Sequence, residues 1–188
     1  MDFQFIASGS AFDVDGFLAA TGLHCDSIFR RGDKYKQTGF RRVLGKAGDL
    51  SFEQQIDAAS RFVDENQVVL SRLREWAGLR HAEILFSPEI VPRVDMTSTR
   101  SYTMPAAFVQ TCAALGLELG VAVRLKFPDG PVETELHSRV DPRTGVQMKI
   151  TLHPAFRDAV AENSFREVGL QFVGGRAYAT MCCCRIAS

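Results

Sequence analysis

The sequence predicts an α+β fold, in which a largely antiparallel sheet carries one long helix and two or three short helices on one face. The order of the expected elements supports this class: a strand, a helix, a strand, the long helix and a strand are followed by a helix and several strands. Glycine-ended helices and a clear hairpin pattern in the second half point in the same direction. We therefore expect the helices to bury their apolar sides against a sheet.

The long helix is predicted over residues 51–77, where no proline or glycine interrupts the sequence. A bend, if there is one, is expected at Asn66, whose helix propensity is middling. Ser51 and Gln54 fit a capping box at its start, and Gly78 supplies the left-handed residue that ends a helix. Its apolar residues recur at helical spacing and are expected to be buried: Phe52, Ile56, Ala59, Val63, Leu70, Leu73 and Trp76. Its polar residues are expected to stay in water: Gln55, Asp57, Arg61, Asp64, Glu65, Arg72 and Glu75.

Shorter elements precede and follow this helix. A short helix is predicted over 14–21, capped by Asp13, with Phe17, Leu18 and Ala20 facing inward. A second short helix is predicted from Pro105 to about Leu115, and a third over 154–161. Strands are predicted over 3–7, 27–30, 40–44, 81–86, 101–103, 121–127, 169–173 and 176–184.

The clearest hairpin pairs residues 132–140 with residues 146–152 across the turn Asp141-Pro-Arg-Thr-Gly145. Apolar residues alternate with polar residues along both strands, which is typical of a sheet with one face on a core and one face in water. Four residues of its polar face form a candidate ligand or catalytic site: Glu133, Glu135, His137 and His153. An exposed polar sheet face explains the same pattern without any function.

Length and composition limit the possible classes. The 188 residues predict a single domain, with a possible subdivision into 1–90 and 100–188 joined by a proline-, serine- and threonine-containing linker over 87–100. The 22 basic and 22 acidic residues cancel, so no global field favours nucleic acid. No segment is long and apolar enough to span a membrane, and the first residues do not resemble a signal peptide.

The five cysteines are an odd number, and three of them, Cys182, Cys183 and Cys184, are adjacent. This pattern is unlike a secreted disulfide framework, so we expect a reducing cytoplasm. Neighbouring residues of a strand point to opposite faces, which disfavours a zinc site at this triplet. The cysteines are expected to be small buried residues.

The strongest functional signal is a basic stretch, in which seven cationic side chains fall within 17 residues from Arg30 to Lys46. Phe29, Tyr35 and Phe40 are interleaved with them, and arginine forks bind carboxylates and phosphates well. We therefore expect a loop that binds an acidic partner through Arg30, Arg31, Lys34, Tyr35, Lys36, Arg41 and Arg42. The alternative is a solvated loop whose charges balance the acidic residues of the long helix.

Several of these segments together resemble a small bacterial protein family of unknown function. The resemblance covers about residues 3–127 and rests on Phe5-Ile6-x-x-Gly9, Asp13-x-x-x-Phe17-Leu18-x-x-x-Gly22-Leu23, Arg31-Gly32-Asp33, the helix over 51–77 and Ala114-Leu115-Gly116. It implies a small cytoplasmic protein of the immunity or partner-binding type. The resemblance implies no catalytic residues.

The sequence thus favours a non-enzymatic bacterial interaction module, of the immunity or regulatory kind, with a protein partner. It contains no recognisable phosphate loop, nucleophile elbow or zinc-protease motif, so no catalytic residue, metal or cofactor is predicted. No membrane contact and no nucleic acid is expected, and no oligomeric state is indicated. The alternative is a small enzyme or ligand-binding domain that uses the glutamate and histidine residues of the 132–153 hairpin.

Overall fold

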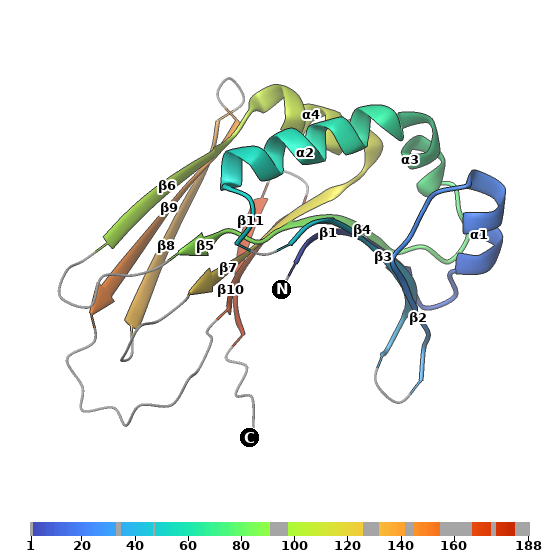
Figure 1. Ribbon diagram of the computed structural model, residues 1–188, viewed down its shortest axis with the longest axis horizontal. Coiled ribbons are helices and arrows are strands. Elements are labelled where there is room, and N and C mark those ends of the chain that lie inside the picture. Colours follow the sequence, from blue (N-terminus) through green and yellow to red (C-terminus); the bar gives the residue numbers. More distant parts are fainter. Residues whose placement is uncertain are drawn as a thin grey trace.

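The computed structural model describes residues 2–32, 35–46, 48–90, 98–125, 132–141, 145–154, 167–173 and 176–182. Most of the strands form one curved, largely antiparallel sheet with the order β11-β10-β7-β4-β1-β3-β2, and β5 pairs with β7 at its side (Figure 1). Among the described strand pairs, β4–β7 and β5–β7 alone are parallel. The strands are β1 Phe3–Gly9, β2 Ser27–Phe29, β3 Thr38–Gly45, β4 His81–Phe86, β5 Glu89–Ile90, β7 Glu118–Leu125, β10 Glu167–Val173 and β11 Arg176–Cys182. The predicted α+β class with a mostly antiparallel sheet is confirmed.

A second sheet has three strands in the order β6-β9-β8. These strands are β6 Ser98–Met104, β8 Val132–Asp141 and β9 Gly145–Pro154. The register of β8 and β9, with Val140 opposite Val146 and Thr134 opposite Leu152, is that of the predicted hairpin. Tyr102 of β6 packs against the ring of Phe52, with centroids 4.7 Å apart, and so joins this sheet to the main core.

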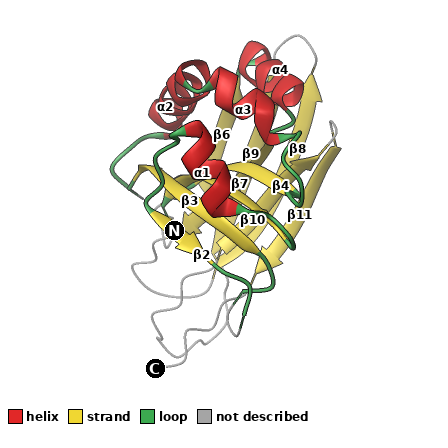
Figure 2. Cartoon of the chain, turned by 90° about the vertical axis from the view of Figure 1, so that its right-hand side faces the viewer, coloured by secondary structure: helices red, strands yellow, loops and turns green. Residues whose placement is uncertain are grey.

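Four helices cover one face of the main sheet, its convex side in Figure 1, and Figure 2 shows the same arrangement from the side. They are α1 Val14–Thr21, α2 Phe52–Glu65, α3 Gln67–Leu73 and α4 Ala106–Leu115. The caps agree with the sequence: Asp13 accepts the N–H of Gly16, and Ser51 with Gln54 forms the capping box. Within the described chain, none of these helices has the length and apolar character needed to cross a membrane.

The predicted single helix over 51–77 is wrong, because the structure divides it at Asn66 into α2 and α3. Asn66 leaves helical geometry, with φ −112° and ψ 13°, and its side-chain amide donates to the carbonyl of Phe62 at 2.7 Å. Asparagine competes in this way with the helical hydrogen bonds of the backbone. Residues 74–77 lie in turns rather than helix, although Gly78 has the expected positive φ of 82°.

Gln55 is another departure, because it is fully buried instead of exposed to water. Its side-chain amide donates to the carbonyls of Leu50 and Ser87, and its carbonyl accepts the N–H of Ser87 at 2.9 Å. These bonds satisfy backbone groups at the end of β4 that would otherwise be buried without a partner. Gln55 therefore ties α2 to β4.

Other boundaries also differ from the predictions. The predicted linker over 87–100 includes β5 and the start of β6, and its residues 91–97 lie outside the described part. Pro154 ends β9, whereas the rest of the predicted helix over 154–161 lies outside the described residues, as do Cys183 and Cys184. In α1, Phe17 is buried as expected but Ala20 is exposed, and Val14 takes the inward position.

Alternation along β1 defines the two faces of the main sheet. Phe3, Phe5 and Ala7 are fully buried on the helix side, where the rings of Phe5 and Phe62 lie 5.2 Å apart. Gln4 and Ile6 consequently belong to the opposite face. The described residues thus form one well-filled core beneath the helices, and no described helix covers the opposite face of the sheet.

Candidate functional site

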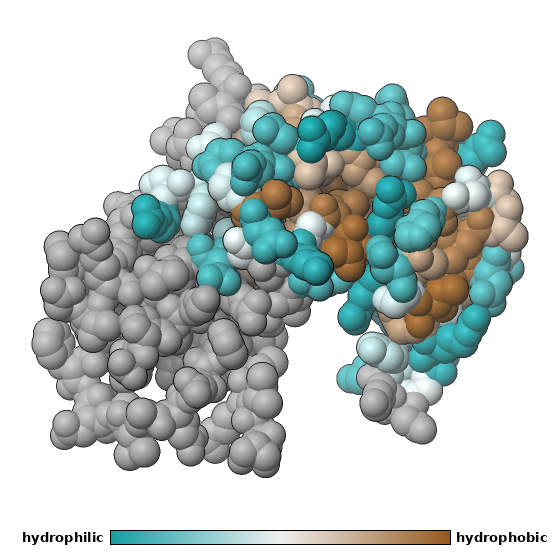
Figure 3. All heavy atoms as spheres, in the orientation of Figure 1, coloured by the Kyte–Doolittle hydropathy of each residue, from teal (hydrophilic) through white to brown (hydrophobic). Residues whose placement is uncertain are grey.

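The helix-free face of the main sheet is the region in which the predicted and the unexpected polar residues meet. We call it the concave face, and the alternation and register of its strands assign to it a set of described side chains that includes Gln4, Ile6, Ser8, Phe29, Arg41, Val43, His81, Glu83, Leu85 and Glu118. None of the described helices packs on this face, and the surface is hollowed beneath these strands in Figure 3. On this face Val43 and His81 are exposed, whereas Gln4 and Ser8 are buried, so the concave face is only partly open to water.

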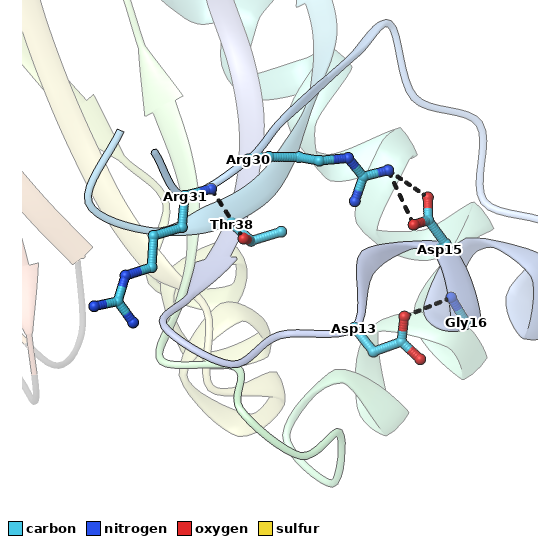
Figure 4. A network of polar contacts seen from close by, with 6 residues as sticks. All are labelled: Asp13, Asp15, Gly16, Arg30, Arg31 and Thr38. Atoms are coloured by element: carbon cyan, nitrogen blue, oxygen red, sulfur yellow. Dashed lines mark hydrogen bonds and ion pairs between the residues drawn. The ribbon is translucent and has the colours of Figure 1, made fainter. Parts of the chain in front are cut away.

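The structure does not bring the basic stretch together on one surface. Arg30 turns toward α1 and forms a two-pronged ion pair with Asp15, with nitrogen–oxygen distances of 2.9 and 3.0 Å. The hydrogen bond to Asp15 raises the pKa of Arg30. Arg31 points the other way, and its backbone N–H donates to the hydroxyl of Thr38 (Figure 4).

Arg41 and Arg42 are adjacent on β3 and lie on opposite faces of the sheet. The guanidinium of Arg42 lies on the helix side, 5.1 Å from the centre of the Phe62 ring. Arg41 lies on the concave face, opposite Ile6 of β1. Phe40, which precedes Arg41 on β3, is fully buried in the core and is not part of an aromatic binding surface.

Arg41 has an unusual environment. Its guanidinium lies 5.2 Å from the ring centre of Phe29 and 5.9 Å from that of Tyr35, a geometry that favours the cation. Its Nε atom is buried without a hydrogen-bond partner, and no ion pair of Arg41 is found within the described residues. Tyr35 is 40% exposed and Lys36 is exposed beside it, whereas Lys34 lies outside the described part.

The concave face also carries a charged group that the sequence analysis did not predict, formed by Glu83, Glu118 and His81. Glu83 of β4 is half-buried and leans across β7, where a Cβ at Gly120 would overlap its carboxylate. Glu118, the register partner of Glu83, interacts with the imidazole of His81 at 3.3 Å. The sequence signal was a glutamate between the buried residues Ala82 and Ile84, but the neighbouring strand could not be known without the fold.

Burial raises the pKa of Glu83, and the nearby carboxylate of Glu118 raises it further, while His81 opposes the shift. The folded protein therefore holds this proton more tightly than the unfolded chain. The resulting stabilisation is complete at pH values below the unfolded pKa and is lost as the pH rises through the folded pKa.

Replacing Glu83 by glutamine is therefore expected to increase the free energy of unfolding more at about pH 7.5 than at about pH 4.5, because the cost of ionising the wild-type carboxyl grows as the pH rises. Urea unfolding of wild type and Glu83→Gln at the two pH values measures this difference. Glu75→Gln, at an exposed helix-side position, serves as the control and should show no such growth with pH. An equal effect of Glu83→Gln at both pH values would contradict the expectation.

The alternative site on the β8–β9 hairpin has the predicted backbone pairing. Glu133 is the register partner of His153, whereas Glu135 pairs with Thr151 and His137 with Lys149. Elsewhere, Cys112 is fully buried, and burial raises the pKa of its thiol to about 12. Where the chain is described, no three histidine, cysteine or acidic side chains are grouped so that they could hold a metal ion.

Comparisons with protein-family models, curated proteins and solved structures yield no match. The candidate site is therefore defined by the fold and by the contacts described above.

Proposed function

We propose that this chain is a non-enzymatic interaction module, of the immunity or regulatory kind, that binds an acidic partner. The contact region is the hairpin surface, which we define as Phe29, Tyr35, Lys36, Arg41 and Val43 of β2, β3 and the turn between them. The observation that carries the proposal is the state of Arg41, which is supported by two aromatic rings but has no anionic partner within the described chain. Arg30, by contrast, already has Asp15.

The physical argument begins with the cost of leaving Arg41 unpaired. A buried donor without an acceptor costs about 1–3 kcal/mol, and a carboxylate of a partner would remove this cost. The rings of Phe29 and Tyr35 hold the guanidinium in place, which lowers the entropy lost on binding. Arginine and tyrosine are also enriched among the residues that dominate protein–protein binding energies.

Apolar exposure supports the same region. Tyr35 and Val43, two of the four large apolar side chains that the described part of the chain exposes, belong to the hairpin surface. The exposed Ile28 is the register partner of Phe40 and lies on the opposite face of the sheet. Exposed apolar side chains beside cationic residues are typical of a surface that binds another protein. The balanced total charge disfavours general attraction to nucleic acid but not a local acidic partner.

The immunity or regulatory role is the part of the proposal that rests on the family resemblance of residues 3–127. An immunity protein needs no catalytic group, because it acts by covering its target. A cytoplasmic location, inferred from the cysteine pattern, agrees with this role. A toxin gene directly upstream would favour the immunity role over a regulatory one.

An array of immobilised peptides of about eight residues, in which net charge and apolar content vary independently, tests the proposal. The wild-type protein is expected to bind peptides that combine acidic and apolar residues. Arg41→Glu should weaken this binding by tenfold or more, since an attractive charge pair becomes a repulsive one. Binding is measured by fluorescence anisotropy on the peptides selected from the array.

Arg42→Glu is the matched control, because it makes the same charge change one residue away but on the helix side. Thermal melting of both variants establishes that each remains folded. Equal loss of binding in both variants would point to a general charge effect. No preference for acidic peptides, or full binding by Arg41→Glu, would overturn the proposal.

A further inference from the structure

The concave face carries two opposite charges that do not neutralise each other. Arg41 and Glu83 are both register partners of Ile6, on the two strands that flank β1. Neighbouring strands are about 4.8 Å apart, so the two backbones lie roughly 10 Å from each other. Long side chains at this separation can meet, yet the described ion pairs are Arg30–Asp15 and His81–Glu118.

Each charge is held away from the other by a local feature of the sheet. The cation–π contacts with Phe29 and Tyr35 hold the Arg41 guanidinium over β2 and the following turn. Glu83 leans the other way, into the space that the missing side chain of Gly120 leaves on β7. Ile6, which is partly exposed, forms the apolar floor between them.

The two neighbouring acids of the concave face, Glu83 and Glu118, differ in their interaction partners. Glu118 has His81 as a neighbour, whereas no hydrogen bond or ion pair of Glu83 is found within the described chain. Keeping a half-buried carboxylate beside a second carboxylate destabilises the folded protein. Natural proteins retain such unfavourable charges mainly where a ligand uses them.

We infer that the concave face binds a peptide segment of the partner that carries both charges, with an acidic side chain on Arg41 and a basic side chain on Glu83. This inference rests on the proposed function, because it takes the acidic group at Arg41 from there and adds the second contact. A ligand with both charges satisfies both groups at once, whereas a purely acidic segment would be repelled by Glu83 and Glu118. The apolar floor at Ile6 accommodates an uncharged residue between the two.

The geometry also sets the spacing within the segment. The Arg41 guanidinium leans toward β2 and the Glu83 carboxylate lies over β7, and these two strands are four strand spacings, or roughly 19 Å, apart. An extended peptide advances about 3.3 Å per residue, so its two charges should be about three to six residues apart when side-chain reach is included. Peptides with the acidic and basic residues adjacent, or at the two ends of a longer segment, fit less well.

The experiment compares three sets of peptides of about eight residues by fluorescence anisotropy with the full-length protein. One set has a glutamate and a lysine about three to six residues apart, one has the glutamate alone, and one has the lysine alone. The mixed set is expected to bind wild type roughly tenfold more tightly than the glutamate set. Glu83→Gln should abolish this difference while leaving the binding of the glutamate set intact or stronger.

Glu75→Gln provides the matched control, because it removes one negative charge at an exposed helix-side position. It should leave the difference between the mixed and glutamate sets unchanged. Equal binding of these two sets to wild type, with both lost in Arg41→Glu, would overturn the inference and leave the proposed function standing. Tight binding that survives Arg41→Glu, or no binding by any set, would overturn both.

Discussion

Replacing Gly78 by alanine is expected to destabilise the protein by about 2–5 kcal/mol, because two costs act at this position. Gly78 has a φ of 82°, a conformation that is unfavourable for residues with a Cβ. A Cβ would also overlap the backbone carbonyl of Ala11, and the carbonyl of Gly78 itself packs closely on Gly9. Backbone atoms on both sides cannot move away without shifting the end of β1. Urea unfolding followed by circular dichroism measures the loss.

Gly22→Ala separates the two costs. Gly22 also has a positive φ, 67°, at the end of α1, but the space around its Cβ position is open. Its replacement should therefore cost only about 1–2 kcal/mol, the price of the left-handed conformation alone. Equal destabilisation by the two substitutions would show that the close approach of Gly78 to Ala11 contributes nothing.

The role of Gly78 also illustrates how far the sequence predicts the fold. Its left-handed conformation was predicted correctly from the glycine that follows a helical segment. The helix is broken at Asn66, and α3 ends at Leu73, after which the N–H groups of Glu75 and Trp76 bond the carbonyls of Arg72 and Leu73 in tight turns. The propensity of Asn66 predicts a bend at the right residue, whereas the complete break also depends on the bond of its side chain to Phe62, which the structure shows.

The candidate site was predicted only in part, for a related reason. The density of cations draws attention to the segment from Arg30 to Lys46, but a count of charges does not say which face of the sheet each side chain takes. Alternation along β3 sends Arg41 and Arg42 to opposite faces, and the predicted strand over 40–44 already contained this information. Glu83 was missed because its environment depends on the pairing of β4 with β7, which are separated by more than thirty residues of sequence.

The substitution Phe40→Ala tests the core side of this same strand, and we expect it to destabilise the protein by about 3–5 kcal/mol. Phe40 is fully buried, and its ring centre lies 5.9 Å from that of Phe5 and 5.8 Å from that of Phe17. Removing the ring leaves a cavity among aromatic neighbours that close backbone packing prevents from collapsing. Urea unfolding gives the magnitude, and Phe40→Leu, which keeps most of the volume, should lose markedly less.

Val68→Ala is the control for this substitution, because Val68 is 70% exposed on α3 and should change the free energy of unfolding by no more than about 0.5 kcal/mol. The Phe40 variants also test the hairpin surface, because Phe40 anchors in the core the strand that carries Arg41 on the concave face. If Phe40 were instead a contact residue of the hairpin surface, Phe40→Ala would weaken peptide binding while leaving stability near the wild-type value. The alternation of β3 places Phe40 on the helix side. We therefore expect Phe40→Leu to lower the free energy of unfolding while the folded variant keeps its affinity for the peptides.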